Sequence, residues 1–157
     1  MPSVLFVCTA NICRSPMAEA LLKSKIITMT DRNDWRIESA GTWANNGLQA
    51  STNSTTVMEE KGINIQEHRS RMVTAELLNQ FNLILVMEKG HKEALQVEFP
   101  KLSDRIYLIN EMIGRKDDVR DPYGSTLNDY RDTAMEIEHI LAEGFERIYQ
   151  LAVNKPT

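Results

Sequence analysis

The stretch Val4-Leu-Phe-Val-Cys8-Thr-Ala-Asn-Ile-Cys13-Arg14-Ser15-Pro16 near the N-terminus decides the fold. Its first four residues are apolar, which is typical of a short strand buried in a sheet. Pro16 suits the first turn of a helix, where its missing N–H group is not needed, and small and apolar residues follow it. The stretch therefore predicts a strand, a tight loop that begins at Cys8 and ends at Ser15, and a helix over residues 16–27.

The loop has the composition of an anion-binding site built around a nucleophile. Five residues separate Cys8 from Arg14, which is enough for successive backbone N–H groups to converge on a phosphate beside a helix N-terminus. Such a field favours the thiolate form of a cysteine, and an arginine guanidinium matches two phosphate oxygens. We expect Cys8 to be the nucleophile, Arg14 to clamp the phosphate and Ser15 to donate its hydroxyl to the sulfur. The expected phosphate-binding residues are Thr9, Ala10, Asn11, Ile12, Cys13, Arg14 and Ser15.

A simpler interpretation makes Cys8 a small core residue at the end of a buried strand. Cysteine and arginine at this spacing also occur together by chance, but the strand before the loop and the helix after it favour an active site. The loop is not a nucleotide P-loop, because it lacks the Gly-Lys-Ser/Thr sequence of that motif.

A second candidate site residue lies late in the chain, in Asp121-Pro122-Tyr123. Pro122 fixes its own φ and disfavours helix at the residue before it, so the Asp121 carboxyl group is expected on a stiff loop. Dephosphorylation through a thiolate needs a proton for the leaving group and later a base for water, and one carboxyl group serves both steps. Asp121 is therefore the expected general acid and base. Asp117 and Asp118 are weaker candidates because neither precedes a proline.

Strands and helices are expected to alternate along the chain. Apolar or alternating segments predict strands at residues 4–7, 35–39, 83–87 and 106–109, and helices are expected at residues 16–27, 55–61, 74–79, 89–99 and 126–153. This order is typical of an α/β fold with a parallel sheet and right-handed crossovers. Ligands bind beyond the carboxyl ends of such strands, where Cys8 would lie. The last helix carries an apolar stripe that is expected to face the core without a functional role: Tyr130, Ala134, Ile137, Leu141, Phe145, Ile148 and Ala152.

The two motifs together resemble the low-molecular-weight protein tyrosine phosphatase family. That family has Cys-x-Gly-Asn-x-Cys-Arg-Ser-Pro near its N-terminus and Asp-Pro-Tyr about four-fifths along, and this chain matches both except for Ala10 in place of glycine. If that position needs a positive φ, Ala10 would be strained. The resemblance covers essentially the whole chain, so it implies one domain over residues 1–157. It also implies a three-layer sandwich of the flavodoxin-like type, with a four-stranded parallel sheet flanked by helices.

The resemblance assigns roles to further residues. It implies hydrolysis of phosphotyrosine through a cysteinyl-phosphate intermediate, with no cofactor and no metal. Ser39 and His68 would support the loop, with His68 holding Asn11 in place. Trp43 and Tyr123 would form aromatic walls, and Ile12 would complete an apolar slot for a phenyl ring. The Pro-Asp-x-Arg signature that usually follows the first wall is missing, and Gly124 replaces a second tyrosine.

Three other functions are weighed against phosphotyrosine hydrolysis. A related subfamily removes phosphate from arginine and has threonine at the position of Ile12, so Ile12 favours phosphotyrosine, although the single aromatic residue after Asp121-Pro122 resembles that subfamily. Arsenate reductases that use thioredoxin need further cysteines to relay a disulfide, and this chain has none beyond Cys8 and Cys13. A non-catalytic phosphate-binding module would not need Cys8, Arg14 and Asp121 together.

The bulk composition bounds the class of protein. The 157 residues are 42% hydrophobic and 25% charged with a net charge of −4, which gives no reason to expect nucleic acid or an anionic membrane as partner. No apolar run approaches the roughly 20 residues that span a bilayer, and a cytoplasmic monomer is expected. The histidines (His68, His91 and His139) are scattered, so no metal site is expected. Expected partners are phosphotyrosine proteins, a tyrosine kinase, and phosphate-like or sulfate-like anions.

The two cysteines share one loop, which excludes a disulfide scaffold. A reversible disulfide between Cys8 and Cys13 under peroxide is a further hypothesis. Its competitor is that Cys13 is simply a small buried loop residue.

Overall fold

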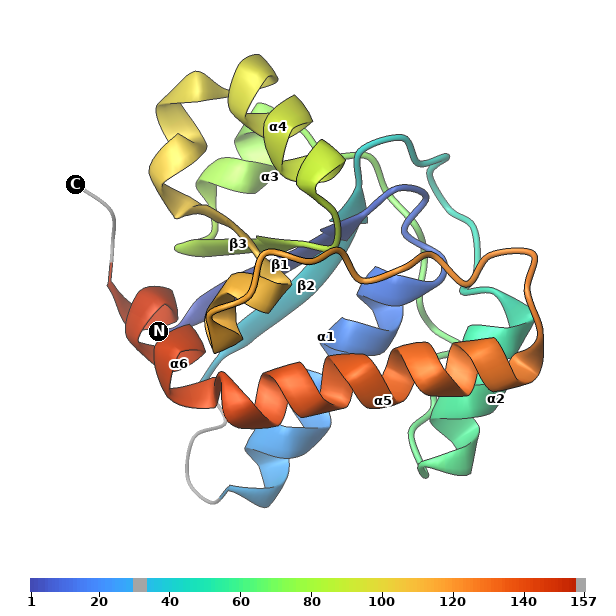
Figure 1. Cartoon of the computed structure of the whole chain (residues 1–157). Coiled ribbons are helices and arrows are strands. Elements are labelled where there is room, and N and C mark those ends of the chain that lie inside the picture. The colour runs from blue at the N-terminus through green and yellow to red at the C-terminus, as the bar shows by residue number, and fades with distance from the viewer. Residues whose placement is uncertain (30–33, 155–157) are drawn as a thin grey trace.

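A parallel sheet of four strands forms the centre of the structure, which is a computed structural model that describes residues 1–29 and 34–154. The strands are β1 (Ser3–Cys8), β2 (Arg36–Gly41), β3 (Leu83–Val86) and β4 (Ile106–Leu108). Their order across the sheet is β2-β1-β3-β4, and every neighbouring pair is parallel. The expected four-stranded parallel sheet is confirmed, and β1 lies at its centre (Figure 1).

Helices cover both faces of this sheet, which gives the three layers expected from the sequence. One face packs against α1 (Arg14–Thr28), α2 (Thr52–Glu60), α5 (Leu127–Glu143) and α6 (Phe145–Val153). The other face packs against α3 (Ala75–Asn79), α4 (Lys89–Glu98) and the 3₁₀ helix η1 (Pro100–Arg105). A second 3₁₀ helix, η2 (Ile109–Ile113), follows β4 directly.

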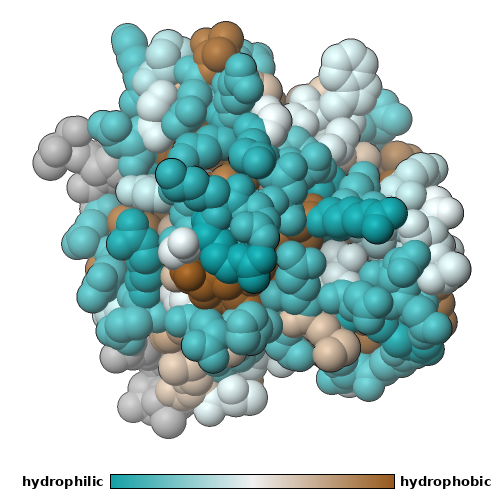
Figure 2. All heavy atoms as spheres, in the orientation of Figure 1, coloured by the Kyte–Doolittle hydropathy of each residue, from teal (hydrophilic) through white to brown (hydrophobic). Residues whose placement is uncertain are grey.

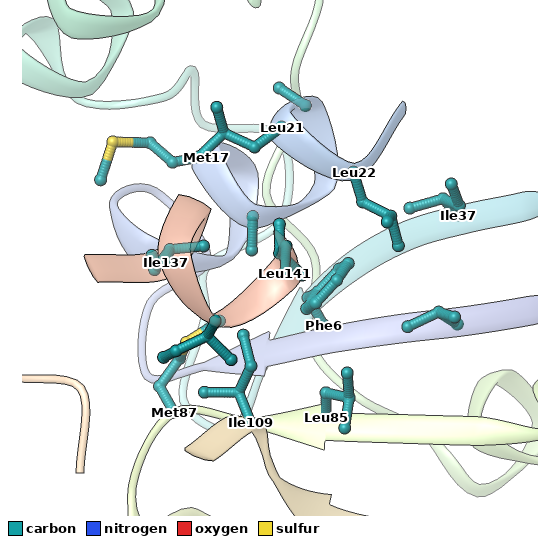
Figure 3. Close-up of a cluster of buried hydrophobic side chains, with 14 of the residues drawn as sticks. Phe6, Met17, Leu21, Leu22, Ile37, Leu85, Met87, Ile109, Ile137 and Leu141 are labelled. Atoms are coloured by element: carbon teal, nitrogen blue, oxygen red, sulfur yellow. The ribbon is translucent and has the colours of Figure 1, made fainter. Parts of the chain in front are cut away.

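The apolar run of β1 is continuous because both of its faces are covered. Val4 and Phe6 belong to the core on the α1 and α5 side, and Leu5 and Val7 belong to the core on the α3 and α4 side. All four side chains are fully buried. Figure 3 shows the first of these cores, with Phe6 among side chains from α1, α5 and the neighbouring strands.

The expected final helix over residues 126–153 is in fact two helices that meet at Gly144. A Cβ atom at Gly144 would lie 2.8 Å from Cβ of Met112 and 2.9 Å from the carbonyl oxygen of Ile140. The chain thus passes too close to η2 at this point for any side chain, and the helix axis breaks there. The apolar stripe nevertheless continues through the break, and all seven of its residues are buried as expected.

Helix termini follow the sequence in most places. Thr74 caps α3 by accepting a hydrogen bond from the Leu77 N–H group at 3.0 Å, as its residue type favours. The helix expected from residue 55 instead begins at Thr52, because Ser51 caps it by accepting from the Ser54 N–H group.

The visible face is mostly hydrophilic (Figure 2), and within the described residues no helix has both the length and the apolar character to cross a membrane.

Candidate active site

The loop from Cys8 to Ser15, here called the phosphate loop, connects the carboxyl end of β1 to the start of α1. It forms the wall of a cavity of about 330 Å³. The lining residues come from the phosphate loop and from two segments distant in sequence: Cys8, Thr9, Ala10, Ile12, Cys13, Arg14, Asn45, Leu48, Asp121 and Tyr123. The structure therefore brings the expected nucleophile, clamp and acid to one cavity at the carboxyl ends of the strands.

The Cys8 sulfur has a hydroxyl donor at its side. Its Sγ lies 3.0 Å from Oγ of Ser15, and that hydroxyl already accepts a hydrogen bond from Asn11 Nδ2 at 2.8 Å. The Ser15 proton has two possible acceptors, the sulfur at 3.0 Å and the Ala40 carbonyl oxygen at 3.5 Å, and the sulfur is the nearer. A hydrogen bond of this kind stabilises the charged form of its acceptor, so the geometry suits a thiolate nucleophile.

Asn11 fixes the shape of the phosphate loop from within. It is the one non-glycine residue with positive φ in the described chain, at 59°, a conformation that asparagine tolerates. Its buried side chain donates to Ser39 Oγ at 3.0 Å and accepts from the Arg71 N–H group at 3.0 Å. Nε2 of His68 lies 2.7 Å from the Asn11 carbonyl oxygen. Both expected supports, Ser39 and His68, thus contact this one residue.

The strain considered for Ala10 does not arise. The positive φ of the phosphate loop falls on Asn11, one residue later. Alanine in place of glycine is therefore compatible with the backbone at this position.

Arg14 is 1% exposed and has two distinct edges. Its Nη1 donates to Glu88 Oε2 at 2.5 Å and to the Val119 carbonyl oxygen at 2.7 Å. Its Nη2 lies 3.5 Å from Asp121 Oδ2, and its buried Nε has no hydrogen-bond partner among the described residues. One edge is thus anchored to the protein, and the Nε–Nη2 edge can receive an oxyanion in bidentate fashion.

The segment that carries Asp121 is anchored just before the carboxylate. Asp118 Oδ1 accepts from the Lys89 N–H group at 2.7 Å, and the Val119 N–H group donates to the Met87 carbonyl at 2.8 Å. Asp121 itself is exposed at the cavity and accepts from the Tyr123 N–H group at 3.0 Å. Asp118, a weaker candidate for the acid, thus holds the loop to the start of α4.

The aromatic walls are only partly as expected. Ile12 and Tyr123 line the cavity. Trp43 does not line it, and its side chain is 81% exposed. The Trp43 N–H group donates to the Thr9 carbonyl at 2.9 Å, so its backbone is held at the loop while its ring lies in solvent. Asn45 and Leu48 from the following segment line the cavity instead.

Sequence reasoning missed several residues that touch the phosphate loop, among them Glu88, His91 and Tyr130. Glu88, the N-cap of α4, contacts Arg14, and His91 Nε2 lies 2.8 Å from Thr9 Oγ1. The hydroxyl of Tyr130, expected only as a core residue, lies 3.4 Å from Cys13 Sγ. The available signal for Tyr130 was its residue type, since a buried tyrosine needs a partner for its hydroxyl group.

Cys13 lies in a different environment from Cys8. Burial raises the pKa of the Cys13 thiol, so it stays protonated at neutral pH, with the Tyr130 hydroxyl and Ser51 Oγ as partners. Cys13 is thus placed as a packed loop residue.

No three His, Cys, Asp or Glu side chains are grouped as metal ligands within residues 1–29 and 34–154.

Comparison with known proteins adds independent observations. A family model described as low molecular weight phosphotyrosine protein phosphatase matches residues 3–153. A protein-arginine-phosphatase from Geobacillus stearothermophilus is 34% identical over 146 residues, which cover 92% of this chain and 95% of that protein. The probable low molecular weight protein-tyrosine-phosphatase EpsP from Ralstonia solanacearum is 35% identical over 136 residues, which cover 87% of this chain and 88% of that protein.

A solved structure agrees with the fold as well. The crystal structure of a low molecular weight protein tyrosine phosphatase from T. tengcongensis superposes with a TM-score of 0.88 at 38% identity, and the match covers 94% of this chain and 99% of that one. The matched residues of the family model, 3–153, include both motifs, and the two relatives match 92% and 87% of this chain. The chain belongs to the low molecular weight phosphotyrosine protein phosphatase family, a family of cysteine-dependent phosphatases.

Proposed function

We propose that this phosphatase hydrolyses phosphotyrosine in proteins through a phosphorylated cysteine, with Cys8 as nucleophile and Asp121 as acid and base. One observation carries the proposal: Cys8, Arg14 and Asp121 line the same cavity. The Nε–Nη2 edge of Arg14 and the backbone N–H groups of the phosphate loop would bind the phosphoryl oxygens. Preorganised donors of this kind stabilise the charge that develops in the transition state.

The first chemical step transfers the phosphoryl group to sulfur. The Cys8 thiolate forms an S–P bond while the bond between phosphorus and the tyrosine oxygen breaks. The leaving phenoxide takes a proton from the Asp121 carboxyl group. The products of this step are tyrosine, cysteinyl phosphate and the Asp121 carboxylate.

The second step returns the enzyme to its starting form. Asp121 accepts a proton from a water molecule, whose oxygen attacks phosphorus while the S–P bond breaks. Inorganic phosphate leaves, Cys8 is again a thiolate beside the Ser15 hydroxyl, and Asp121 is again protonated. The sum of both steps is hydrolysis of one phosphate ester by one water.

The choice of phosphotyrosine as substrate rests on the cavity wall. Ile12, Leu48 and Tyr123 give the cavity an apolar side on which a phenyl ring can pack. Phosphoarginine is the second candidate, because a relative that is 34% identical is named a protein-arginine-phosphatase. A guanidinium group would lack polar partners against the Ile12 side chain.

Competing assays on matched phosphotyrosine and phosphoarginine peptides test this choice. We expect the larger kcat/KM for phosphotyrosine, and we expect Ile12→Thr to shift the ratio of the two kcat/KM values toward phosphoarginine. Preference of the parent protein for phosphoarginine would overturn the substrate assignment while leaving the role of Cys8 intact.

The proposal includes a cellular setting. Phosphotyrosine proteins would be the substrates, a tyrosine kinase would supply them, and the protein would act as a cytoplasmic monomer. The thiolate nucleophile requires Cys8 in its reduced form, which suits a reducing compartment.

A further inference from the structure

Two side chains at the start of α4 contact opposite ends of the phosphate loop. Glu88 bonds Arg14 near the end of the loop at 2.5 Å, and His91 contacts Thr9 near its beginning at 2.8 Å. The two are also joined to each other, because the Glu88 N–H group donates to Nδ1 of His91 at 3.2 Å. We call this pair the α4 bracket. It forms a continuous connection from α4 to the residues on either side of the anion site.

The hydrogen bonds define the protonation state of His91. Its Nδ1 accepts from a backbone N–H group, so in the neutral ring the proton is on Nε2. Nε2–H then donates to the Thr9 hydroxyl oxygen. The Thr9 backbone is held as well, since its carbonyl accepts from the Trp43 N–H group. Thr9 directly follows Cys8 and lines the cavity, so fixing Thr9 fixes the first peptide unit of the loop.

We propose that His91 is a positioning residue, whose neutral ring orients Thr9 so that the phosphate loop keeps its anion-binding shape. The role is exerted through Thr9, because His91 is not among the residues that line the cavity. As a statement about catalysis it rests on the proposed phosphatase function. As a statement about anion binding it can be tested without turnover.

Protonation of His91 would break the α4 bracket. Both ring nitrogens would then be donors, and Nδ1–H would face the Glu88 N–H group. Nε2 lies 3.8 Å from Glu88 Oε2, so a charged ring would also compete with Arg14 for that carboxylate. The charged groups facing His91 are Arg14 from α1, Glu88 from the start of α4, and Asp118 and Asp121 from the segment that carries Asp121.

These charged groups shift the pKa of His91 in opposite directions. Burial first, and the Arg14 guanidinium second, lower the pKa of His91, while the three carboxylates oppose the shift. The ring is therefore neutral at neutral pH, and the α4 bracket is intact under those conditions.

Two substitutions at His91 separate its two hydrogen bonds. His91→Gln places an amide nitrogen near the position of Nε2 and can still donate to Thr9. His91→Asn places an amide oxygen near the position of Nδ1 and can still accept from Glu88, but it does not reach Thr9. Thr9→Val removes the same contact from the other side, so the test survives if a His91 variant fails to fold. Glu93→Gln, exposed on the same helix, is the matched control.

The measurement is the dissociation constant of inorganic sulfate by calorimetry, with thermal unfolding of each variant as a check on folding. We expect His91→Asn and Thr9→Val each to weaken binding about fivefold to tenfold, in line with the loss of one buried hydrogen bond. The double variant should be no weaker than either single variant, because both remove one contact. His91→Gln should restore most of the affinity, and Glu93→Gln should match the parent protein.

Sulfate affinity like that of the parent in His91→Asn, or additive effects in the double variant, would overturn the positioning role. So would a common loss in His91→Asn and His91→Gln, since that pattern indicates a merely structural histidine. If the parent binds sulfate but hydrolyses no aryl phosphate, the proposed function fails and the comparison of His91 variants still stands. If the parent binds no sulfate, both fail.

Discussion

Arg14 divides its guanidinium group between the protein and the anion site. Nη1 is held by Glu88 and by the Val119 carbonyl. The other edge can receive an oxyanion, because Nε has no partner among the described residues and Nη2 has only the Asp121 carboxylate, at 3.5 Å. A lysine could not do both, since its ammonium group has no planar fork. The meeting of Cys8, Arg14 and Asp121 in one cavity could be predicted, because their residue types and spacing carry the chemistry of phosphoryl transfer. The contact between Glu88 and Arg14 could not be predicted, because the residues around Glu88 do not indicate that α4 begins beside Arg14.

Substitution of Asp121 tests its proposed role as the general acid. Asp121→Asn cannot donate a proton to the leaving group, so kcat/KM should fall by about 10²–10⁴. The loss should be larger for aryl phosphates with poor leaving groups, because these need the proton most. Steady-state kinetics on a series of substituted phenyl phosphates measures this dependence.

Asp117→Asn is the control for that series, because Asp117 is exposed and pairs with Arg115 away from the cavity. Its kinetics should match those of the parent. An Asp121→Asn protein with the same leaving-group dependence as the parent would show that the proton comes from elsewhere.

The helices show where prediction from the sequence reaches its limit. Apolar periodicity identified the buried stripe of the last helix, but α5 and α6 separate at Gly144 because that glycine lies against Met112. Contacts between segments distant in sequence leave no trace in local periodicity. The family resemblance also has a limit, since it implied that Trp43 forms a wall of the cavity, whereas this residue is 81% exposed.

A pair of glycine substitutions tests the account of this break. Gly144→Ala places a Cβ atom 2.8 Å from that of Met112, and overpacking of this kind should lower the free energy of unfolding by about 1–3 kcal/mol. Gly90→Ala in α4 meets nothing within 4 Å, so it should raise the free energy of unfolding by up to about 1 kcal/mol. Urea denaturation of both variants measures the difference, and equal effects would contradict the packing argument.

The sheet as a whole connects the parts of the site. Four strands and their parallel direction follow from apolar runs that alternate with helices, and these were predictable. The order β2-β1-β3-β4, which places the start of α4 beside the phosphate loop, does not follow from these runs, and only the resemblance to a flavodoxin-like fold implies it. Long-range pairing of strands depends on how all the layers pack together, which no single segment encodes.

The pH dependence of stability follows from His91. Burial and Arg14 lower its pKa in the folded protein, so below its unfolded value of about 6.5 the unfolded chain binds a proton that the folded one does not. This contribution to the free energy of unfolding is therefore present at neutral pH, and it is lost progressively as the pH falls from about 6.5 toward the lowered pKa of the folded protein. The parent should lose more stability than His91→Gln between pH values of about 7 and 5 in urea titrations. Parallel curves for the two proteins would contradict the lowered pKa.

The covalent step at Cys8 can be observed directly. The protein is mixed with an aryl phosphate, turnover is stopped with acid, and the peptides are analysed by mass spectrometry. We predict that the peptide containing Cys8 gains one phosphoryl group on sulfur during turnover, and that Cys8→Ser loses turnover while it still binds sulfate. A phosphoryl group on another residue, or sustained turnover by Cys8→Ser, would contradict the assignment of Cys8 as the nucleophile.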